Sequence, residues 1–570
     1  MKKWVLKPSQ KIPSQLKTLK LNPATLQLLI QRGLSTREKI DSFLNTSYEA
    51  LYSPLDLNGV REAVERIVKA KKKQEKIVIY GDYDADGTTS AALLKEVLEE
   101  VGVSPAGLYI PDRNKEGYGL NCQAIDYLKL EHGADLIITV DCGISNREEI
   151  KYARQKGIEV IVTDHHSIPE KIPQNCVIIN PKLENQNYPF KDLAGVGVVF
   201  KLAQALYEKI IPEKVQQLKW FLDIVAIGTI ADCVPLLDEN RALAKFGLIV
   251  LQKTKRIGLQ EILKVARINI DEKNPPSTYN ISFQIGPRLN AAGRMDHADL
   301  TLNLLTEGDR IKARLMALEV EKKNTQRQKI TNEIYLEVKK TLDKEKEHRL
   351  ILKSGKNWPA GVVGIVAGKL CEDYNCPVFL FREEKGIFKG SGRSINDFNI
   401  IAAVRKIDHL VGKYGGHAQA MGLEVKKENF KAFEASLLEI IDESYDEESW
   451  GRKTFIDIEL DSQNIDWDLF SEIRKFEPYG EGNEEPVFLS RGLKIREVNT
   501  VGNGQKHLKF VFETYQANPK SFEGIFFGGG NNFSKFAVGN KVDAVYNLRS
   551  NSWNGRHKLS LNIIDIKMSG

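Results

Sequence analysis

The sequence has 570 residues, more than one hydrophobic core usually organises, so we expect three or four domains. Hydrophobic residues make up 42% of the chain and charged residues 28%, and no uninterrupted apolar stretch is long enough to cross a membrane. The formal net charge of +6 is small for this length, so composition alone does not indicate a nucleic-acid partner.

The sequence lacks the marks of an exported protein. Residues Met1 to Lys20 contain lysines but no apolar segment followed by a small-residue cleavage site, so we expect a cytoplasmic protein. The six cysteines are scattered and form no Cys-x-x-Cys pair. This spacing predicts neither a zinc site nor a disulfide framework.

The first half of the chain predicts an N-terminal segment followed by an α/β domain. Residues 1–75 mix short helical patterns with loop signals, whereas short β-rich runs alternate with helical stretches from Lys76 onward. This alternation is typical of parallel βαβ units. We therefore assign residues 1–45 to the N-terminal segment and residues 46–300 to an α/β domain with a parallel sheet and a helical extension.

The second half predicts a connecting helix, a second α/β domain and a β domain. Residues 301–346 contain almost no Gly or Pro, and a continuous helix over them would span about 70 Å at roughly 1.5 Å per residue. Residues 347–445 form another α/β pattern, and the acidic stretch Asp442 to Glu448 is typical of a linker. Residues 450–570 are rich in strand patterns with little helix, which predicts a small five-stranded barrel of the OB type.

Three carboxylates follow the first predicted strand at every second position. The run Gly81-Asp82-Tyr83-Asp84-Ala85-Asp86-Gly87 comes directly after the strand Ile77 to Tyr80, at the edge of a parallel sheet where ligands bind. Anions this close repel one another unless a cation neutralises them or their pKa values shift. The alternatives are an ordinary acidic turn and an EF-hand loop, but Leu93 stands at the twelfth position, where an EF-hand needs an acidic residue.

Two later strands and one turn carry similar residues. Val140-Asp141-Cys142-Gly143 and Val162-Thr163-Asp164-His165-His166 both end predicted parallel strands, whose carboxyl ends converge. Ile230-Ala231-Asp232-Cys233 adds a carboxylate after an apolar helix. A lone histidine is more often structural, but a tandem pair after an aspartate at a strand end favours a ligand. Hard oxygen ligands with one or two imidazoles favour manganese or magnesium over zinc.

In this order, the motifs resemble those of the DHH phosphoesterase family, whose signature is the Asp-His-His triplet. The resemblance implies a site for two Mn²⁺ or Mg²⁺ ions, in which Asp141 bridges the ions and His166 lies beside the ligands. One position departs from the pattern, because Tyr80 stands where some members have a histidine. The implied ligands are Asp82, Asp84, Asp86, Asp141, His165 and Asp232, and the implied catalytic residues are Asp84, Asp86, Asp141, His165, His166, Asp232 and His417.

Such a pair of ions makes a protein nucleophile unnecessary. Two ions about 3.5–4 Å apart activate a bridging water, orient it in line with the leaving oxygen and stabilise the charged transition state. The chain has no GxxxxGK loop, which argues against hydrolysis of nucleoside triphosphates.

The second α/β domain carries two glycine-rich segments. Gly390-Ser391-Gly392-Arg393-Ser394 offers hydroxyl donors and a planar guanidinium for phosphate oxygens, and Gly415-Gly416-His417 allows close approach of the backbone, although a plain turn is the alternative there. Both segments resemble the DHHA1 substrate-binding domain, which implies that His417 lies near the scissile phosphate. The predicted substrate-phosphate residues are Arg113, Arg288, Arg294, Ser391, Arg393, Ser394 and His417.

The predicted barrel interleaves aromatic rings with cations, as in His507, Lys509, Phe510 and Phe512. Nucleobases stack on exposed rings while cations follow the backbone, but many of these rings must form the barrel core. Trp553, in a predicted loop, and the surface cations are therefore the better candidates for contacts with single-stranded DNA.

Within the DHH family, residues 45–570 resemble exonucleases that digest single-stranded DNA from its 5′ end. The resemblance implies release of 5′-mononucleotides in DNA repair and recombination, a grip on the terminal 5′-phosphate by Arg113, Arg288 and Arg294, and a helicase and a single-strand-binding protein as partners. A second hypothesis is a hydrolase of short oligonucleotides or cyclic dinucleotides, which needs only the two α/β domains. A third is a non-catalytic DNA-binding scaffold, which the complete set of carboxylates disfavours.

Overall fold

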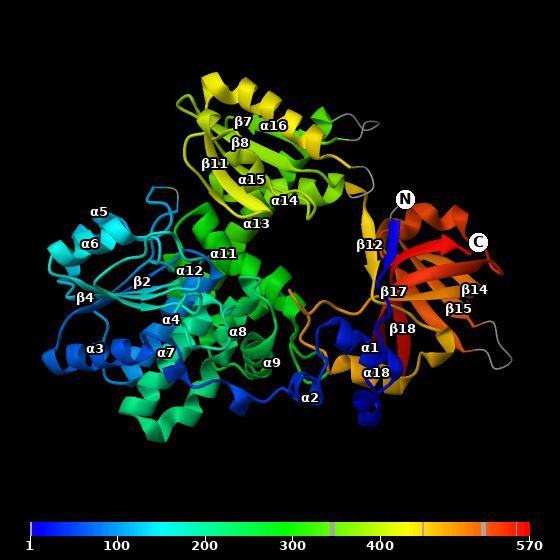
Figure 1. Cartoon of the computed structure of the whole chain (residues 1–570), viewed down its shortest axis with the longest axis horizontal. Helices are drawn as coiled ribbons and strands as arrows, with labels where there is room; N and C mark the ends of the chain where they lie inside the picture. Colours follow the sequence, from blue (N-terminus) through cyan, green and yellow to red (C-terminus); the bar gives the residue numbers. More distant parts are fainter. Residues whose placement is uncertain are drawn as a thin grey trace. The chain divides into compact units, whose positions relative to one another are not determined.

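The computed structural model describes residues 3–569, apart from residue 114 and the segments 343–347, 447–449, 515–519 and 554–555; at 552, 553 and 556 it describes the backbone alone. The chain forms two compact units, one of Leu51–Gly451 and one made of both chain ends, Met1–Ala50 with Arg452–Gly570 (Figure 1). Among the described residues, no helix combines the length and the apolar character needed to cross a membrane.

The larger unit contains a five-stranded parallel sheet, as the βαβ pattern predicts (Figure 1). In the order in which they pair, its strands are β3 (Gly107–Tyr109), β2 (Ile77–Gly81), β4 (Leu136–Val140), β5 (Glu159–Thr163) and β6 (Val177–Ile179). Strands β2 and β4 are buried along their whole length, which explains their continuous apolar sequences. Because the strands are parallel, their carboxyl ends lie at one edge of the sheet.

Helices pack on this sheet and extend the domain beyond it. They are α3 (Val60–Lys73), α4 (Ala85–Glu100), α5 (Cys122–His132), α6 (Arg147–Gln155), α7 (Gly195–Ile210), α8 (Leu222–Ala231), α9 (Asp238–Gln252), α10 (Ile257–Val265), α11 (Gly286–Met295) and α12 (Asp299–Thr306). The helices α5 and α6 share a core with the sheet, in which Leu128 and Ile150 accompany Val78 and Val160. Helix α4 begins within the acidic run and contacts β2, α7 and α8, so it fixes the run at the sheet edge.

The connecting helix is shorter than the sequence predicts. Helix α13 runs from Arg310 to Thr341, and the predicted span 301–346 also includes the end of α12 and a break at Gly308. Asp309 ends the break by capping α13, since its carboxylate accepts a hydrogen bond from Lys312 N at 2.8 Å. At roughly 1.5 Å per residue, the 32 residues of α13 span about 48 Å. Residues 343–346 of the prediction lie outside the described part of the chain.

The rest of the larger unit is the predicted second α/β domain, built on a mixed sheet. Its strands pair in the order β10 (Tyr414–Gly416), β11 (Ala420–Lys426), β9 (Ile387–Arg393), β8 (Val378–Glu384) and β7 (Ile351–Gly355), and only β7 and β8 are parallel. Helix α14 (Ala360–Tyr374) packs against β7 and β8 in a core that also receives α13. Helices α15 (Ile400–Arg405) and α16 (Phe430–Ser444) pack with Phe379 and Phe381 in a second core.

The smaller unit contains the predicted five-stranded barrel. Its strands are β14 (Phe488–Val501), β15 (His507–Glu513), β16 (Ser521–Phe526), β17 (Lys541–Trp553) and β18 (Arg556–Met568). The pairing order β14-β15-β16-β18-β17 closes because β17 also pairs with β14, and the β16–β18 pair is parallel. This closure confirms the OB type. The side chain of Trp553, our candidate for base stacking, lies outside the described residues.

The N-terminal segment packs into the same unit as the barrel. Strand β1 (Lys3–Leu6) pairs in parallel with β12 (Lys453–Ile456), and a short β13 (Ile458–Glu459) then leads to β14. Helix α1 (Pro23–Gln31) buries Leu28 and Leu29 in a core shared with α18 (Trp467–Arg474) and the barrel, and α2 (Arg37–Leu44) adds Phe43. The two ends of the chain therefore form one hydrophobic core.

Substitution of Leu29 should destabilise the barrel although the two are far apart in sequence. Leu29→Ala removes a fully buried side chain and should cost the smaller unit about 2–4 kcal/mol. Hydrogen exchange read by mass spectrometry should then accelerate in β14–β18 and stay unchanged in β2–β5. Lys17→Ala, at an exposed position of the same segment, is the control. Equal acceleration in both units would contradict the shared core.

Candidate metal and phosphate-binding site

The acidic run extends from the end of β2 into the first turn of α4 and is fixed by backbone donors. Asp84 caps α4, accepting hydrogen bonds from Asp86 N at 2.9 Å and Gly87 N at 3.1 Å. Asp86 is buried against the N-terminus of α7, where its carboxylate accepts from Gly195 N at 2.7 Å and Val196 N at 2.8 Å. A helix N-terminus stabilises a buried negative charge. The Oδ1 atom of Asp82 is buried without a hydrogen-bond partner.

The ends of β4 and β5 bring two further carboxylates to this edge. Asp141 adopts a left-handed backbone conformation with φ 60°, and its buried Oδ1 has no hydrogen-bond partner. Asp164 instead points into the loops, accepting from Ile144 N at 2.9 Å, His165 N at 2.7 Å and His166 Nδ1 at 2.7 Å. Burial opposes the charge of Asp164, but the hydrogen bonds from His166 hold its pKa below the ordinary value. Asp164 thus orients the two histidines.

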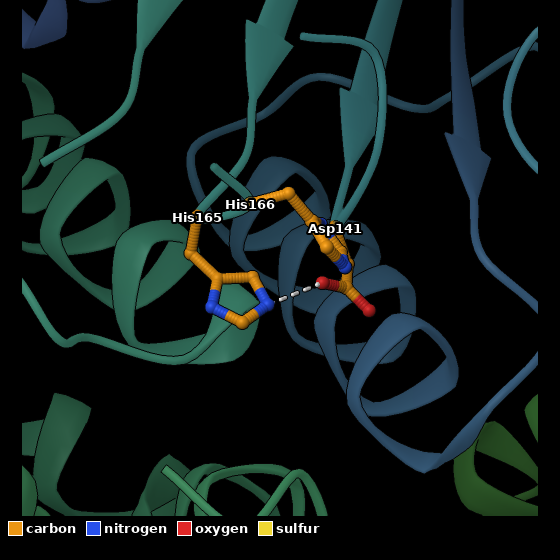
Figure 2. Close-up of side chains that lie close together, drawn as sticks. All are labelled: Asp141, His165 and His166. Carbon is orange, nitrogen blue, oxygen red and sulfur yellow. Dashed lines mark ion pairs between the residues drawn. The ribbon is translucent and has the colours of Figure 1, made fainter. Parts of the chain in front are cut away.

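His165 is the side chain on which the carboxylates converge. Its Nε2 atom lies 3.2 Å from Asp141 Oδ1, 3.5 Å from Asp232 Oδ2 and 3.9 Å from Asp86 Oδ2, and Figure 2 shows the ring pointing at the Asp141 carboxylate. Burial and His166 lower the pKa of His165 to about 3, so the ring is neutral, as a metal ligand requires. Both ring nitrogens are buried and make no hydrogen bond.

The carboxylates around His165 are strongly perturbed. Burial, with repulsion from Asp84, raises the pKa of Asp86 to about 7, and burial with repulsion from Asp86 raises that of Asp232 to about 9. Burial and neighbouring carboxylates also raise the pKa values of Asp82 and Asp141. Protons bound to the carboxylates reduce the repulsion among them, and a cation that bound there would displace these protons.

These side chains fit divalent ions with a preference for oxygen ligands. Buried carboxylate and imidazole atoms without partners are available, and no thiolate competes in these groups. Three overlapping groups offer ligand atoms within 4.8 Å of one another: Asp141, His165 and His166; Asp86, His165 and Asp232; and Asp82, Asp84 and Asp141.

Tyr80 takes no part in this cluster. Its ring is buried beside Tyr109, at 5.3 Å between centroids, and its hydroxyl donates to Gly119 O at 2.9 Å. At the position where some family members have a histidine, this chain therefore has a tyrosine that packs in the core shared with α5 and α6.

Sequence reasoning missed two side chains that fix the site. Tyr118 packs edge-on against His166, and its hydroxyl lies 3.0 Å from His166 Nδ1 and donates to Asp141 O at 3.2 Å. Asn290 of α11 accepts from Ala85 N at 2.7 Å, which attaches α11 to the acidic run. Tyr118 lies in no motif, and Asn290 lies between Arg288 and Arg294 in a segment from which only the arginines were selected.

A cavity of about 620 Å³ in the same unit collects most of the predicted phosphate residues. Its lining includes Tyr83, Arg113 and Arg294 from the first α/β domain and Gly361, Gly364, Ser391, Arg393 and His417 from the second. Arg393 donates to Ser391 Oγ at 2.8 Å, and a Cβ on Gly364 would lie 2.9 Å from both side chains, so a larger residue there would displace them. Among the described residues, no carboxylate forms an ion pair with Arg113, Arg294 or Arg393.

Two predicted phosphate residues lie elsewhere. Arg288 is paired with Glu321, at 2.5 Å between Nε and Oε2, and it does not line the cavity. Ser394 also lies outside the lining and donates to Phe398 O at 2.6 Å, which closes its own loop. Arg288 is thus engaged by a carboxylate, and Ser394 by a hydrogen bond within its own turn.

The barrel keeps its predicted cations at the surface but buries most of its rings. Phe510 and Phe512 are fully buried in the barrel core, whereas Phe527 is exposed. A cleft of about 830 Å³ is lined by Lys509, Lys558 and Arg496 together with the half-exposed Trp467, which sequence reasoning did not select.

Comparisons with known proteins agree with this architecture. Residues 76–229 match the DHH family, N-terminal domain; residues 347–443 match the DHHA1 domain; and residues 456–565 match the RecJ OB domain. The chain is 37% identical to the single-stranded-DNA-specific exonuclease RecJ of Bacillus subtilis, covering 100% of this chain and 71% of that one. It is 33% identical to RecJ of Escherichia coli, covering 96% of both. RecJ of Thermus thermophilus in complex with Mn²⁺ superposes with a TM-score of 0.83 at 28% identity, covering 100% of this chain and 80% of that one.

A parallel sheet with an acidic carboxyl edge, followed by a DHHA1 domain, defines a DHH phosphoesterase. With the OB domain and relatives at 33–37% identity along nearly the whole chain, this chain belongs to the RecJ family.

Removal of one carboxylate should flatten the pH dependence of stability in chelator. Asp232 keeps its proton in the folded protein up to about pH 9, whereas in the unfolded chain it ionises near pH 4, as aspartates do (about 3.9). The folded state binds the extra proton over this range, so the free energy of unfolding falls as pH rises, by at most about 1.4 kcal/mol per pH unit from this group. Asp232→Asn should therefore reduce the change in unfolding midpoint between pH 6 and 9. Asp56→Asn, at an exposed position, is the control, and an unchanged slope in Asp232→Asn would contradict the assignment.

Proposed function

We propose that the protein is a metal-dependent exonuclease that degrades single-stranded DNA from the 5′ end and releases 5′-mononucleotides. One observation supports this proposal above all: the same unit holds a cluster of buried carboxylates around a neutral His165 and a cavity lined by arginines that, among the described residues, have no carboxylate partner. The first suits divalent ions, and the second suits a phosphate. Membership of a family whose members are named single-stranded-DNA-specific exonucleases supplies the substrate class.

In this proposal Asp84, Asp86, Asp141, His165 and Asp232 hold two Mn²⁺ or Mg²⁺ ions, with Asp82 beside them. When bound, the ions supply an activated water and neutralise charge on the phosphoryl oxygens. The chain's own groups set the geometry. Backbone donors of Gly195 and Val196 fix Asp86, and Asp164 holds the His166 ring so that its other nitrogen faces away from the carboxylate.

The arginine-lined cavity would hold the terminal 5′-phosphate. Arg113 and Arg294 approach from one domain, and Ser391, Arg393 and His417 from the other. A planar guanidinium can bind two phosphate oxygens at once, so a strand with a 5′-phosphate would be gripped by its end. Polarity follows, because only the 5′ end carries a terminal phosphate to fill the cavity.

The wider role is part of the same proposal. By family resemblance the protein acts in the cytoplasm in DNA repair and recombination, on strands that a helicase unwinds and a single-strand-binding protein covers. Hydrolysis of dinucleotides in preference to long strands is the competing outcome.

Loss of His165 should abolish cleavage while leaving DNA binding largely intact. The assay incubates long single strands, labelled at either end and carrying a 5′-phosphate or a 5′-hydroxyl, with Mn²⁺ or Mg²⁺ beside the matching duplex. Wild type should release mononucleotides from the 5′ end of single strands and stop in chelator. His165→Ala should be at least about a thousandfold slower, since it removes a metal ligand, and exposed His409→Ala should match wild type. An inactive wild type, or normal activity in His165→Ala, would refute the proposal.

Removal of the smaller unit should weaken affinity for long strands more than chemistry. Because Met1–Ala50 and Arg452–Gly570 share a core, both ends must be deleted together, leaving residues 51–451. Filter binding should show loss of affinity for a long strand and a reduced salt dependence, as phosphate contacts are lost. Hydrolysis of a trinucleotide should persist within about fivefold, provided that melting shows residues 51–451 folded. Unchanged affinity for long strands would exclude a DNA-binding role of the barrel.

A further inference from the structure

Arg327 of α13 carries a charge that no carboxylate among the described residues neutralises. Its Nη2 donates to Asn324 Oδ1 at 2.9 Å, and its Nε is buried without a hydrogen-bond partner. A buried, unpaired cationic donor is costly, so its retention calls for a compensating anion or a role for the charge. Arg327 lies in none of the motifs and does not line the phosphate cavity.

Helix packing places Arg327 against the end of α11 that carries Arg294. One turn before Arg327, Lys323 Nζ lies 2.8 Å from Asp296 Oδ2, and one turn after it, Ile330 packs against the same core as Met295. Residues three and four apart lie on one face of a helix. Arg327 therefore lies on the face of α13 that packs against Met295 and Asp296, the two residues that follow Arg294.

The same face of α13 holds further polar groups without partners. The Nδ2 atom of Asn324, a residue that is only 1% exposed, and the Oγ1 atom of Thr331 are buried and make no hydrogen bond. With Arg327 they stand at positions i, i+3 and i+7. This face of α13 is therefore polar around Arg327, and Asn324 holds the guanidinium through its side-chain oxygen.

Arg327 acts electrostatically on the cavity through Arg294. Burial lowers the pKa of Arg294 to about 10, and Arg113, Arg327 and Arg393 add to the shift by repulsion. Arg294 donates to Gly361 O at 3.1 Å, and both residues line the cavity. Arg113 and Arg393 also line the cavity, whereas Arg327 adds its repulsion from α13, outside the lining. A further charge also raises the potential that an entering anion meets.

We propose that Arg327 is a positioning residue of the phosphate cavity, which holds the Arg294 guanidinium toward the cavity and makes the cavity selective for a dianionic terminal phosphate over a hydroxyl. The inference rests on the proposed function, because it takes the anion to be the 5′-phosphate of the strand. The plain alternative is a helix-packing residue whose loss would affect all substrates alike.

The test compares kcat and KM for short single strands with a 5′-phosphate or a 5′-hydroxyl. Arg327→Gln should lower the preference for the phosphate, as the ratio of kcat/KM values, by about five- to twentyfold through KM, the size expected of one charge acting on a dianion at this range. Arg327→Lys keeps the charge and should retain most of the preference. Arg314→Gln is the matched control, since it removes an arginine of the same helix that lies 3.5 Å from Glu261.

The pH profile separates charge from packing. A phosphate monoester loses its second proton near pH 6, so the wild-type preference should rise from about pH 5.5 to 8 and do so less steeply in Arg327→Gln. An unchanged ratio in Arg327→Gln, or an equal loss on both strands, would overturn the inference.

A binding arm keeps the inference separate from the proposed function. If wild type degrades neither strand, the proposed function fails, and fluorescence anisotropy in chelator with 3′-labelled pentanucleotides decides the role of Arg327. Tighter binding of the 5′-phosphate form by wild type, lost in Arg327→Gln, would support the role. Equal preference in both proteins would exclude it.

Discussion

Repulsion among carboxylates at one edge of a parallel sheet is the constraint on which the larger unit depends. Burial would neutralise these groups if nothing else balanced their charge, and the raised pKa values of Asp86 and Asp232 show how strongly they resist ionisation together. Hydrogen bonds from backbone N–H groups offset part of this repulsion. Helix α7 points its N-terminus at Asp86, and a Cβ on Gly195 would lie 2.5 Å from Asp141 Oδ1, so glycine lets the helix approach closely enough to donate. A bound cation would neutralise the remaining negative charge of the carboxylates.

The convergence of these residues could be predicted because it follows from a local rule. A carboxylate after each parallel strand must reach the same edge, whatever the loops between the strands do. The sequence could not distinguish the arginines in the same way. Arg288 and Arg294 occupy one short glycine-rich segment, yet Glu321 of α13 neutralises the first and the second lines the cavity. That difference depends on contacts with a helix whose position relative to the segment is set by tertiary packing.

In the smaller unit, the sequence alone could have predicted which aromatic rings of β15 are buried. Strand β15 alternates buried and partly exposed residues, so the period of two places Phe510 and Phe512 on the core face and Lys509 on the other. The packing of the barrel with Met1–Ala50 could not be predicted from such a periodic pattern. The pairing of Lys3–Leu6 with Lys453–Ile456 joins residues 450 positions apart, and neither strand carries a pattern that names its partner.

The carboxylate cluster and the arginine-lined cavity are linked by packing around Tyr83. Arg113 lies over the Tyr83 ring at 5.0 Å, and a Cβ on Gly293 would lie 2.6 Å from Tyr83 O, so α11 touches the acidic run immediately before Arg294. Asn290 repeats the attachment one turn earlier by accepting from Ala85 N. The separation between the acidic run and the two arginines Arg113 and Arg294 is therefore set by these contacts. On the proposed function, that fixed separation determines how many nucleotides lie between the gripped phosphate and the hydrolysed bond, and hence the length of the product.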